Sequence, residues 1–151
     1  MSNISDTAKQ HLEDLTAFFG INVEATVKEN EDGIELDIES SPSSPRLIGH
    51  HGETLRALEY LVNQMIRHEF VESPRINVDV AGYRLARRQA LEEQAREIAA
   101  RVTETGKEEE LQPMNPAERR IVHIVLREIE TVKTESRGFD RNRHIVVLPA
   151  E

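Results

Sequence analysis

The chain contains no cysteine and no tryptophan among its 151 residues, and aromatic residues make up only 4% of it. Without cysteine, neither a disulfide framework nor a thiolate metal site is available. No apolar run approaches the roughly 18 residues that a membrane span needs, and the N-terminus lacks the basic and apolar regions of a signal peptide. We therefore expect a soluble, cytoplasmic protein with no membrane span.

Basic residues are scarce in the first half of the chain. Residues 1–80 carry six Lys and Arg against 15 Asp and Glu, whereas residues 81–151 carry 13 of each, so the net charge of -9 arises in the first half. Nucleic-acid binding depends on Lys and Arg displacing counterions from phosphates, which argues against an acidic binder. The charge of the binding face matters more than the net charge of the chain, however, and the arginines of the second half cluster. Composition thus allows a nucleic-acid partner with weak or selective binding.

Apolar periodicity in residues 5–80 predicts a small α+β core. Residues 5–19 and the segment from Gly52 to about residue 70 have the spacing of amphipathic helices. Alternating apolar residues predict strands at 21–27, 34–38 and 76–80. The first two strands should form a hairpin around a turn at residues 31–33. The aromatic residues expected in the core are Phe18, Phe19, Phe70 and Tyr83.

Residues 82–151 predict a second small module, joined closely to the first because Ala81-Gly82 is too short for a flexible linker. A long helix begins at this joint, and another helix covers residues 116–129. Short strands are expected at 111–114, 129–134 and 143–148. The expected boundaries are 1–81 for the first module and 82–151 for the second.

The most informative stretch is the loop Gly49-His50-His51-Gly52 at the mouth of a helix. Glycine lets the main chain approach a sugar-phosphate strand closely, and amides at a helix N-terminus attract anions. A helical turn with Ser44 as its cap and Pro45 in its first position should lead into this loop. A glycine pair alone is equally typical of an ordinary turn, so a nucleic-acid clamp needs support from other features.

A second candidate surface lies on the helix that begins with the capping box Asn115-Pro116-Ala117-Glu118. One side of this helix is apolar, and the other is a basic stripe of Arg119, Arg120, His123 and Arg127. The preceding long helix carries three arginines in its first turns, where the helix dipole favours acids: Arg84, Arg87 and Arg88. These three either meet an anionic partner or form a solvated face balanced by Glu92 and Glu93.

Together these residues resemble the bacterial Jag-like proteins, in which a KH module precedes the module named for an Arg and a His separated by three residues (R-3-H). Residues 48–55 resemble the KH glycine loop, and the element order resembles a type II KH module, α-β-β-α-α-β. Residues 113–123 resemble the core of the R-3-H module, whose defining pair falls on Arg119 and His123. The resemblance implies an α+β fold: a three-stranded KH sheet with helices on one face, then helices packed on a small sheet.

The resemblance also implies non-catalytic binding of single-stranded RNA, with single-stranded DNA as a further ligand, no cofactor, and post-transcriptional regulation. The residues expected to bind RNA are Ile48, Gly49, His50, His51, Gly52, Arg56, Arg84, Arg87, Arg88, Arg119, Arg120 and His123. Bases are expected to meet an apolar lip of Ile48, Leu55 and residues 76–80, since few aromatic residues are present for stacking. Three other arginines fit an RNA contact and an exposed ion pair equally well: Arg127, Arg137 and Arg143.

The chain departs from the family pattern in two respects. Longer members carry an additional N-terminal region, whereas this chain starts with the KH part, so a role of that region is not carried over. The variable loop positions, often basic in KH modules, are His50 and His51, and neutral imidazole offers phosphate only hydrogen bonds. We expect salt-sensitive binding that strengthens as the pH falls through the histidine range, near 6.5 for an unperturbed side chain.

Two other functions have to be weighed. A metal or hydrolytic enzyme is disfavoured, because adjacent His50 and His51 do not point both rings at one ion and no HExxH motif occurs. A protein-interaction adaptor, with the acidic first module docking a basic partner, is the stronger rival and is favoured by the charge of -9. A KH-type protein partner or a homo-oligomer is compatible with either function.

Overall fold

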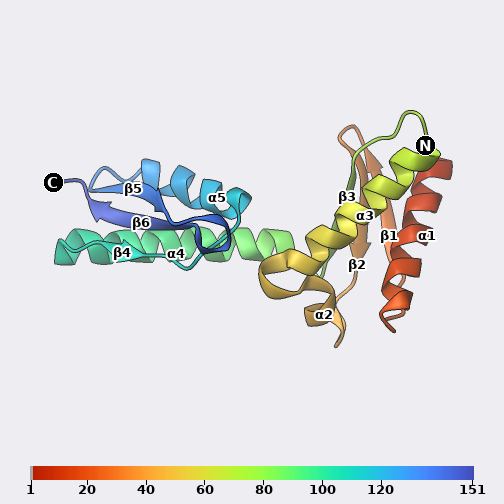
Figure 1. The fold of residues 1–151 in the computed structure, drawn as a ribbon, viewed down its shortest axis with the longest axis horizontal. Helices are drawn as coiled ribbons and strands as arrows, with labels where there is room; N and C mark the ends of the chain where they lie inside the picture. The colour runs from red at the N-terminus through yellow and green to blue at the C-terminus, as the bar shows by residue number, and fades with distance from the viewer. Residues whose placement is uncertain (1) are drawn as a thin grey trace. The chain divides into compact units, whose positions relative to one another are not determined.

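The computed structural model describes residues 2–151, which form two compact units, one ending at Arg84 and the other beginning at Leu85. Each unit combines helices with a three-stranded sheet, which confirms the predicted α+β class (Figure 1). No helix of residues 2–151 is both long enough and apolar enough to cross a membrane.

The first unit contains three strands and the helices that connect and cover them. Its elements are α1 (Ser2–Phe18), β1 (Ala25–Asn30), β2 (Gly33–Ile38), α2 (Ser44–Ile48), η1 (His50–Gly52), α3 (Glu53–Glu69) and β3 (Ile76–Val80). The strand order is β1-β2-β3, with β1 antiparallel to β2 as the predicted hairpin. β3 runs parallel to β2, and the segment from α2 to α3 forms the crossover that a parallel pair requires.

Helices α1 and α3 cover one face of this sheet, as expected (Figure 1). Apolar side chains alternate along β2 and β3 and meet the apolar stripes of the two helices. The largest fully buried side chains of this core are Leu12, Ile34, Leu36, Leu47, Leu55, Leu58, Val62, Ile66 and Ile76. Because Leu47 of α2 and Leu55 of α3 are both buried here, the glycine loop between them is anchored on each side.

Three details of the first unit differ from the predictions. The N-cap of α2 is Ser43, whereas Ser44 lies in the helix and its hydroxyl accepts the Ser41 amide at 2.9 Å. β1 begins at Ala25 instead of residue 21, because Ala25 already pairs with the last residue of β2. Phe18 and Phe19 are 91% and 52% exposed, since they lie beyond the last buried turn of α1, whereas Phe70 and Tyr83 do pack on the core.

The second unit is built along α4 (Tyr83–Thr105), which begins at the boundary between the units. It continues with β4 (Glu109–Glu110), α5 (Pro116–Arg127), β5 (Val132–Arg137), η2 (Asp140–Asn142) and β6 (His144–Pro149). β6 lies between β4 and β5 and is antiparallel to both. The core joins α4, α5 and the sheet through Leu91, Ala95, Ile98, Ala99, Val102, Leu111, Met114, Val122, Leu126, Val132, Ile145 and Val147.

The predicted capping box is half right, and one predicted strand is wrong. Asn115 Oδ1 accepts the amide of Glu118 at 2.9 Å and caps α5 as expected, but the Glu118 carboxylate turns to Arg87. Residues 111–114 form no strand; β4 is the shorter pair 109–110. Residues 111–114 instead form a connection in which Leu111 and Met114 are buried, and the Met114 amide donates to the Arg143 carbonyl oxygen at 3.2 Å.

Candidate nucleic-acid interface

The loop Gly49-His50-His51-Gly52 has a backbone that requires its glycines. Gly49 has φ 72° and ψ -174°, a region almost confined to glycine, and Gly52 is left-handed with φ 76° and ψ 14°. A Cβ on Gly49 would overlap the Thr54 hydroxyl, and one on Gly52 would lie 2.8 Å from Cε1 of Tyr83. The loop's own fold therefore requires both glycines, whether or not a ligand approaches them.

Two stacked imidazoles lie between the glycines. The ring centroids of His50 and His51 are 3.9 Å apart with an interplanar angle of 22°, and His50 is exposed. His51 is itself left-handed, with φ 51°, and its carbonyl oxygen accepts a hydrogen bond from Arg56 Nη1 at 2.9 Å. The N-cap residue of α3 is Gly52, which has no side chain to cap the helix, so this helix end can attract an anion.

The apolar lip expected beside the loop is mostly wrong. Leu55 is 1% exposed, and the apolar residues of β3 are completely buried beneath the helices. Ile48, at the end of α2, is only partly buried against the same core. A ligand can therefore touch Ile48 but not Leu55 or the apolar side chains of β3.

The three arginines at the start of α4 all have carboxylate partners. Arg84 Nη2 lies 2.7 Å from Glu59 Oε2, and Arg84 Nε also donates to the Val78 carbonyl oxygen at 3.0 Å. Arg87 Nε donates to Oε1 of the buried Glu118 at 2.9 Å. Arg88 pairs at 3.3 Å with Glu92 one turn along, as the solvated-face alternative expected. Arg84 and Arg87 therefore stabilise their own units, whereas Arg88, whose side chain is 62% exposed, remains available to solvent.

Arg119 and His123 are both tied into the second unit. Arg119 Nη1 donates to the Met114 carbonyl oxygen at 2.6 Å and fixes the segment that enters α5. The His123 ring lies between two hydroxyls of β5, with Nδ1 2.8 Å from Thr134 Oγ1 and Nε2 3.1 Å from Ser136 Oγ. A hydroxyl can donate or accept, so it suits either ring nitrogen. The defining Arg and His thus hold α5 to its neighbours, and only their remaining surface can meet a ligand.

The pKa of His123 is lowered from its ordinary value of 6.5. Burial opposes the charged ring first, and the positive charges of Arg119 and Arg127 oppose it further. His123 is therefore neutral at pH 7. Any strengthening of nucleic-acid binding that its protonation brings must occur below the usual histidine range.

The lowered pKa predicts a loss of stability in acid. The folded pKa lies below the unfolded value of about 6.5, so the stabilising contribution is complete above that pH and is lost as the pH falls through the folded pKa. Urea unfolding between pH 7.5 and 5 should show a steeper fall for the wild type than for His123→Gln, which cannot titrate. Parallel pH profiles for the two proteins would refute this assignment.

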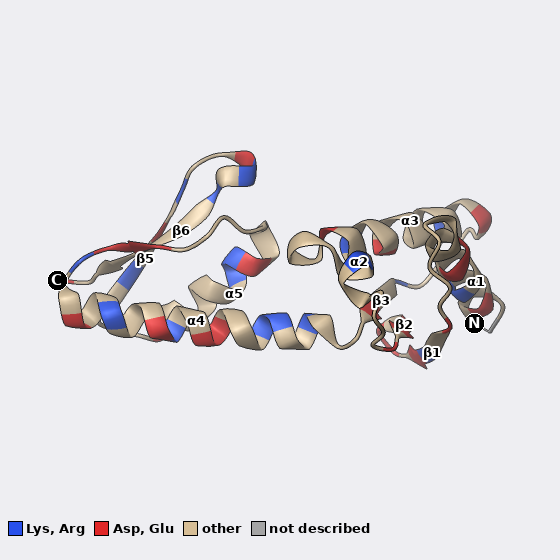
Figure 2. Cartoon of the chain, turned by 90° about the horizontal axis from the view of Figure 1, so that it is seen from below, with Lys and Arg blue, Asp and Glu red and all other residues tan. Residues whose placement is uncertain are grey.

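Two arginines of the basic stripe are free of internal partners. Arg120 and Arg127 are exposed and form no hydrogen bond or ion pair among the described residues. By contrast, Arg137 pairs with Glu108 and Glu135. Figure 2 shows the blue segments at the start of α4 and along α5. The basic face therefore centres on α5, with fewer free cations than the sequence suggests.

Sequence reasoning missed the groups that hold these side chains. Thr134 and Ser136 position His123, and Glu118 receives Arg87. The only sequence signal for the hydroxyls is their alternation along β5, which places both on one face of the strand. The position of Glu118 in the capping box predicted a hydrogen bond from its carboxylate to the backbone. It gave no indication that this carboxylate would pair with Arg87, 31 residues earlier.

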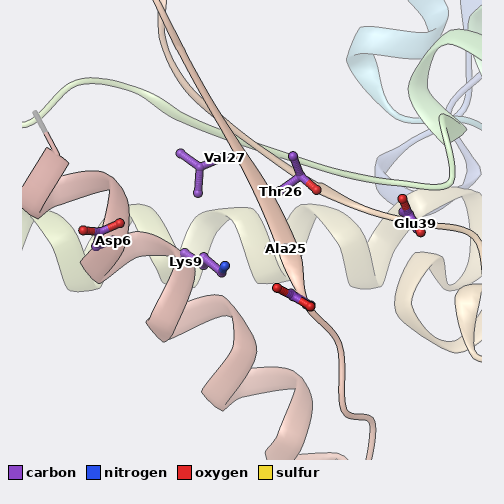
Figure 3. Close-up of a pocket in the computed structure, with 7 residues that line it drawn as sticks. Asp6, Lys9, Ala25, Thr26, Val27 and Glu39 are labelled. Carbon is purple, nitrogen blue, oxygen red and sulfur yellow. The ribbon is translucent and has the colours of Figure 1, made fainter.

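An acidic hollow lies between α1 and β1 in the first unit (Figure 3). It is lined by Asp6, Lys9, Glu24, Ala25, Thr26, Val27 and Glu39. One lysine among three carboxylates makes this hollow unsuitable for phosphate and is the feature that favours a basic partner. Within residues 2–151 no cluster of three or more His, Asp or Glu is placed to hold a metal ion.

Comparison with known families identifies two domains in the order expected. The model of the KhpA/KhpB KH domain matches residues 6–80, and that of the R-3-H domain matches residues 89–149. The first contains the glycine loop, and the second contains Arg119 and His123.

Several bacterial proteins are similar over most of the chain. RNA-binding protein KhpB of Clostridium symbiosum is 33% identical over 145 residues, which cover 95% of this chain and 65% of that protein. The protein of the same name from Bacillus subtilis is 32% identical over 142 residues, 93% of this chain and 68% of that protein. The Streptococcus pneumoniae protein is 29% identical over 84% of this chain and 39% of its own length. The chain thus spans between 39% and 68% of these relatives, and it belongs to the KhpB family of bacterial proteins with a KH and an R-3-H domain.

Proposed function

We propose that the chain binds single-stranded RNA, without catalysing a reaction, by clamping the sugar-phosphate backbone at Gly49-His50-His51-Gly52. The feature that carries the proposal is this turn, which displays two imidazoles beside the N-terminus of α3, where the N-cap is Gly52. The family and the names of the relatives support RNA as the ligand. We further propose that the KH domain spans 1–81 and the R-3-H domain 82–151, and that the chain acts in the cytoplasm as a post-transcriptional regulator.

At the clamp, a backbone phosphate would lie near the start of α3, where the helix dipole is positive. His50 and His51 can hydrogen-bond its oxygens, and Arg56 retains N–H donors beyond the one used on the His51 carbonyl. KH modules hold about four nucleotides in this manner. Ile48 offers a base an apolar contact, so most affinity comes from the backbone and base selection from shape and main-chain groups.

In the second domain, Arg120 and Arg127 are the proposed phosphate contacts, because neither has a carboxylate to leave among the described residues. Arg119 adds its remaining donors, and His123 a neutral ring. Arg88 can exchange an exposed pair, which is worth little, for a phosphate. Arg84 and Arg87 would have to leave partly buried carboxylates unpaired, so we assign them to positioning.

Replacing Arg120 by alanine should weaken RNA binding several-fold and lower the slope of log affinity against log salt by about 0.7, the contribution of one phosphate contact to a single strand. The matched control is Arg101→Ala, which removes an exposed arginine already paired with Glu109 at 3.0 Å. The control should keep the wild-type slope. Equal losses of affinity and slope in both variants would mean that Arg120 contributes only to the overall positive charge and does not contact a phosphate.

Filter binding with a single-stranded RNA at moderate salt tests the proposed function, with DNA of the same sequence as the second ligand. The rival is an adaptor that docks a basic partner on the acidic hollow beside β1. RNA binding predicts salt-sensitive retention that is unaffected by Glu24→Gln and Glu39→Gln. Absence of RNA retention even at low salt would refute RNA binding and favour the adaptor.

A further inference from the structure

Phe139 lies in the loop between β5 and β6 and is 85% exposed. Neither the KH loop nor the Arg/His pair involves this residue. A single exposed apolar side chain is ordinary in itself. What distinguishes Phe139 is how the backbone of its loop is held and which charges surround it.

The loop fixes Phe139 by bonds on both sides. Gly138 has φ 84°, and a Cβ there would lie 2.6 Å from the Asn142 carbonyl oxygen. Arg143 Nη1 donates to the Gly138 carbonyl oxygen at 3.0 Å, and the Asn142 amide donates to the Phe139 carbonyl oxygen at 2.9 Å. The ring is thus presented on an ordered backbone, which reduces the entropy lost when it contacts a ligand.

The loop is also basic. Arg141 is exposed, with no hydrogen bond or ion pair among the described residues, and Arg143 lies at the base of the loop. Asp140 is the only acid in residues 136–144. An exposed ring flanked by cations is the combination that holds single-stranded nucleic acid, because the base stacks while the phosphates meet positive charge. If the ligand of this loop were an apolar protein surface instead, it would offer no negative charge to Arg141.

The loop borders the face that carries Arg119 and His123. His123 contacts Ser136, the second-last residue of β5 before the loop. Arg119 bonds the carbonyl oxygen of Met114, whose amide bonds the carbonyl oxygen of Arg143. A single strand of RNA bound over Arg119 and His123 would therefore continue toward Phe139.

We propose that Phe139 stacks on a base of the bound single-stranded RNA while Arg141 and Arg143 hold the neighbouring phosphates. The inference rests on the proposed RNA binding and adds a base contact to it. It also revises the expectation that base stacking is minor, because one well-placed ring is sufficient for a stacking platform.

Three variants of the full chain test the stack by fluorescence anisotropy with a labelled single-stranded RNA. Phe139→Ala should weaken binding about 5- to 100-fold, the range of one lost stack. Phe139→Leu should show most of the same loss, because leucine keeps the bulk of the side chain but has no ring face. Phe139→Tyr should bind like the wild type. All three should melt like the wild type, because the side chain is exposed. Wild-type affinity in Phe139→Ala would overturn the stack and leave RNA binding intact, whereas no binding by the wild type would overturn the proposed function as well.

A direct spectroscopic test uses the absence of tryptophan from the chain. In Phe139→Trp the new indole is the only one, and stacking on a base should quench its fluorescence. Short polyphosphate, which carries the charge without bases, should not quench it. The matched control is Phe18→Trp, at a 91% exposed position of the first unit. Unchanged Phe139→Trp emission at saturating RNA, or equal quenching in both variants, would contradict the proposal.

Discussion

Replacing His50 and His51 together by aspartate should weaken the binding of single-stranded RNA at least about tenfold at neutral pH. Two carboxylates would then face the phosphates, and like charges brought together at an interface cost several kcal/mol. The turn should survive, because both glycines remain and Asp tolerates the left-handed backbone of His51, φ 51°. Anisotropy titration with a labelled RNA measures the loss.

The control for this variant replaces the same two histidines by asparagine. Asn also tolerates the left-handed conformation, and its amide can donate to phosphate without adding charge. We expect a much smaller loss of affinity, with the same melting temperature as the aspartate variant. Wild-type affinity in the aspartate variant would show that the loop is not a clamp.

Gly49→Ala should destabilise the first unit by about 2–4 kcal/mol, whether or not RNA is present. The cost combines a backbone conformation almost confined to glycine with overlap between the new Cβ and the Thr54 hydroxyl. Urea unfolding, followed by the amide NMR signals of residues 2–84, measures the loss.

Gly20→Ala is the matched control for Gly49→Ala. Gly20 is also left-handed, with φ 78°, but a Cβ there meets no atom within 4 Å, so only the backbone cost of about 1–2 kcal/mol applies. Similar losses at the two positions would mean that the loop relaxes around Thr54. If Gly49→Ala loses much more stability than Gly20→Ala, a loss of RNA binding in a Gly49 variant could result from unfolding of the loop. The histidine variants are therefore the better test of binding.

Local patterns predicted most of the elements correctly. The alternation that placed β2 and β3, and the helical spacing that placed α3 and α5, depend only on residues near one another in the chain. The errors occur where the bounds of an element depend on a pairing partner that is distant in sequence. β1 starts only where β2 offers a pairing residue, and the regular pairing with β6 ends at Glu110.

The candidate site was less predictable for the same reason. The sequence placed Arg84 and Arg87 on a basic face, but Glu59 and Glu118, which lie 25 and 31 residues away, receive them in the folded chain. The glycine loop was recognisable because its motif is contiguous. The exposure of Phe139 depends on packing, which periodicity alone does not determine.

An NMR titration of the isotope-labelled chain with a short single-stranded RNA tests the proposed clamp most directly. The amide signals of Gly49, His50, His51 and Gly52 should shift progressively with RNA, together with those of the exposed face of α5, and the shifts should diminish as salt is raised. RNA that binds while the signals of residues 49–52 stay in place would contradict the clamp at this loop.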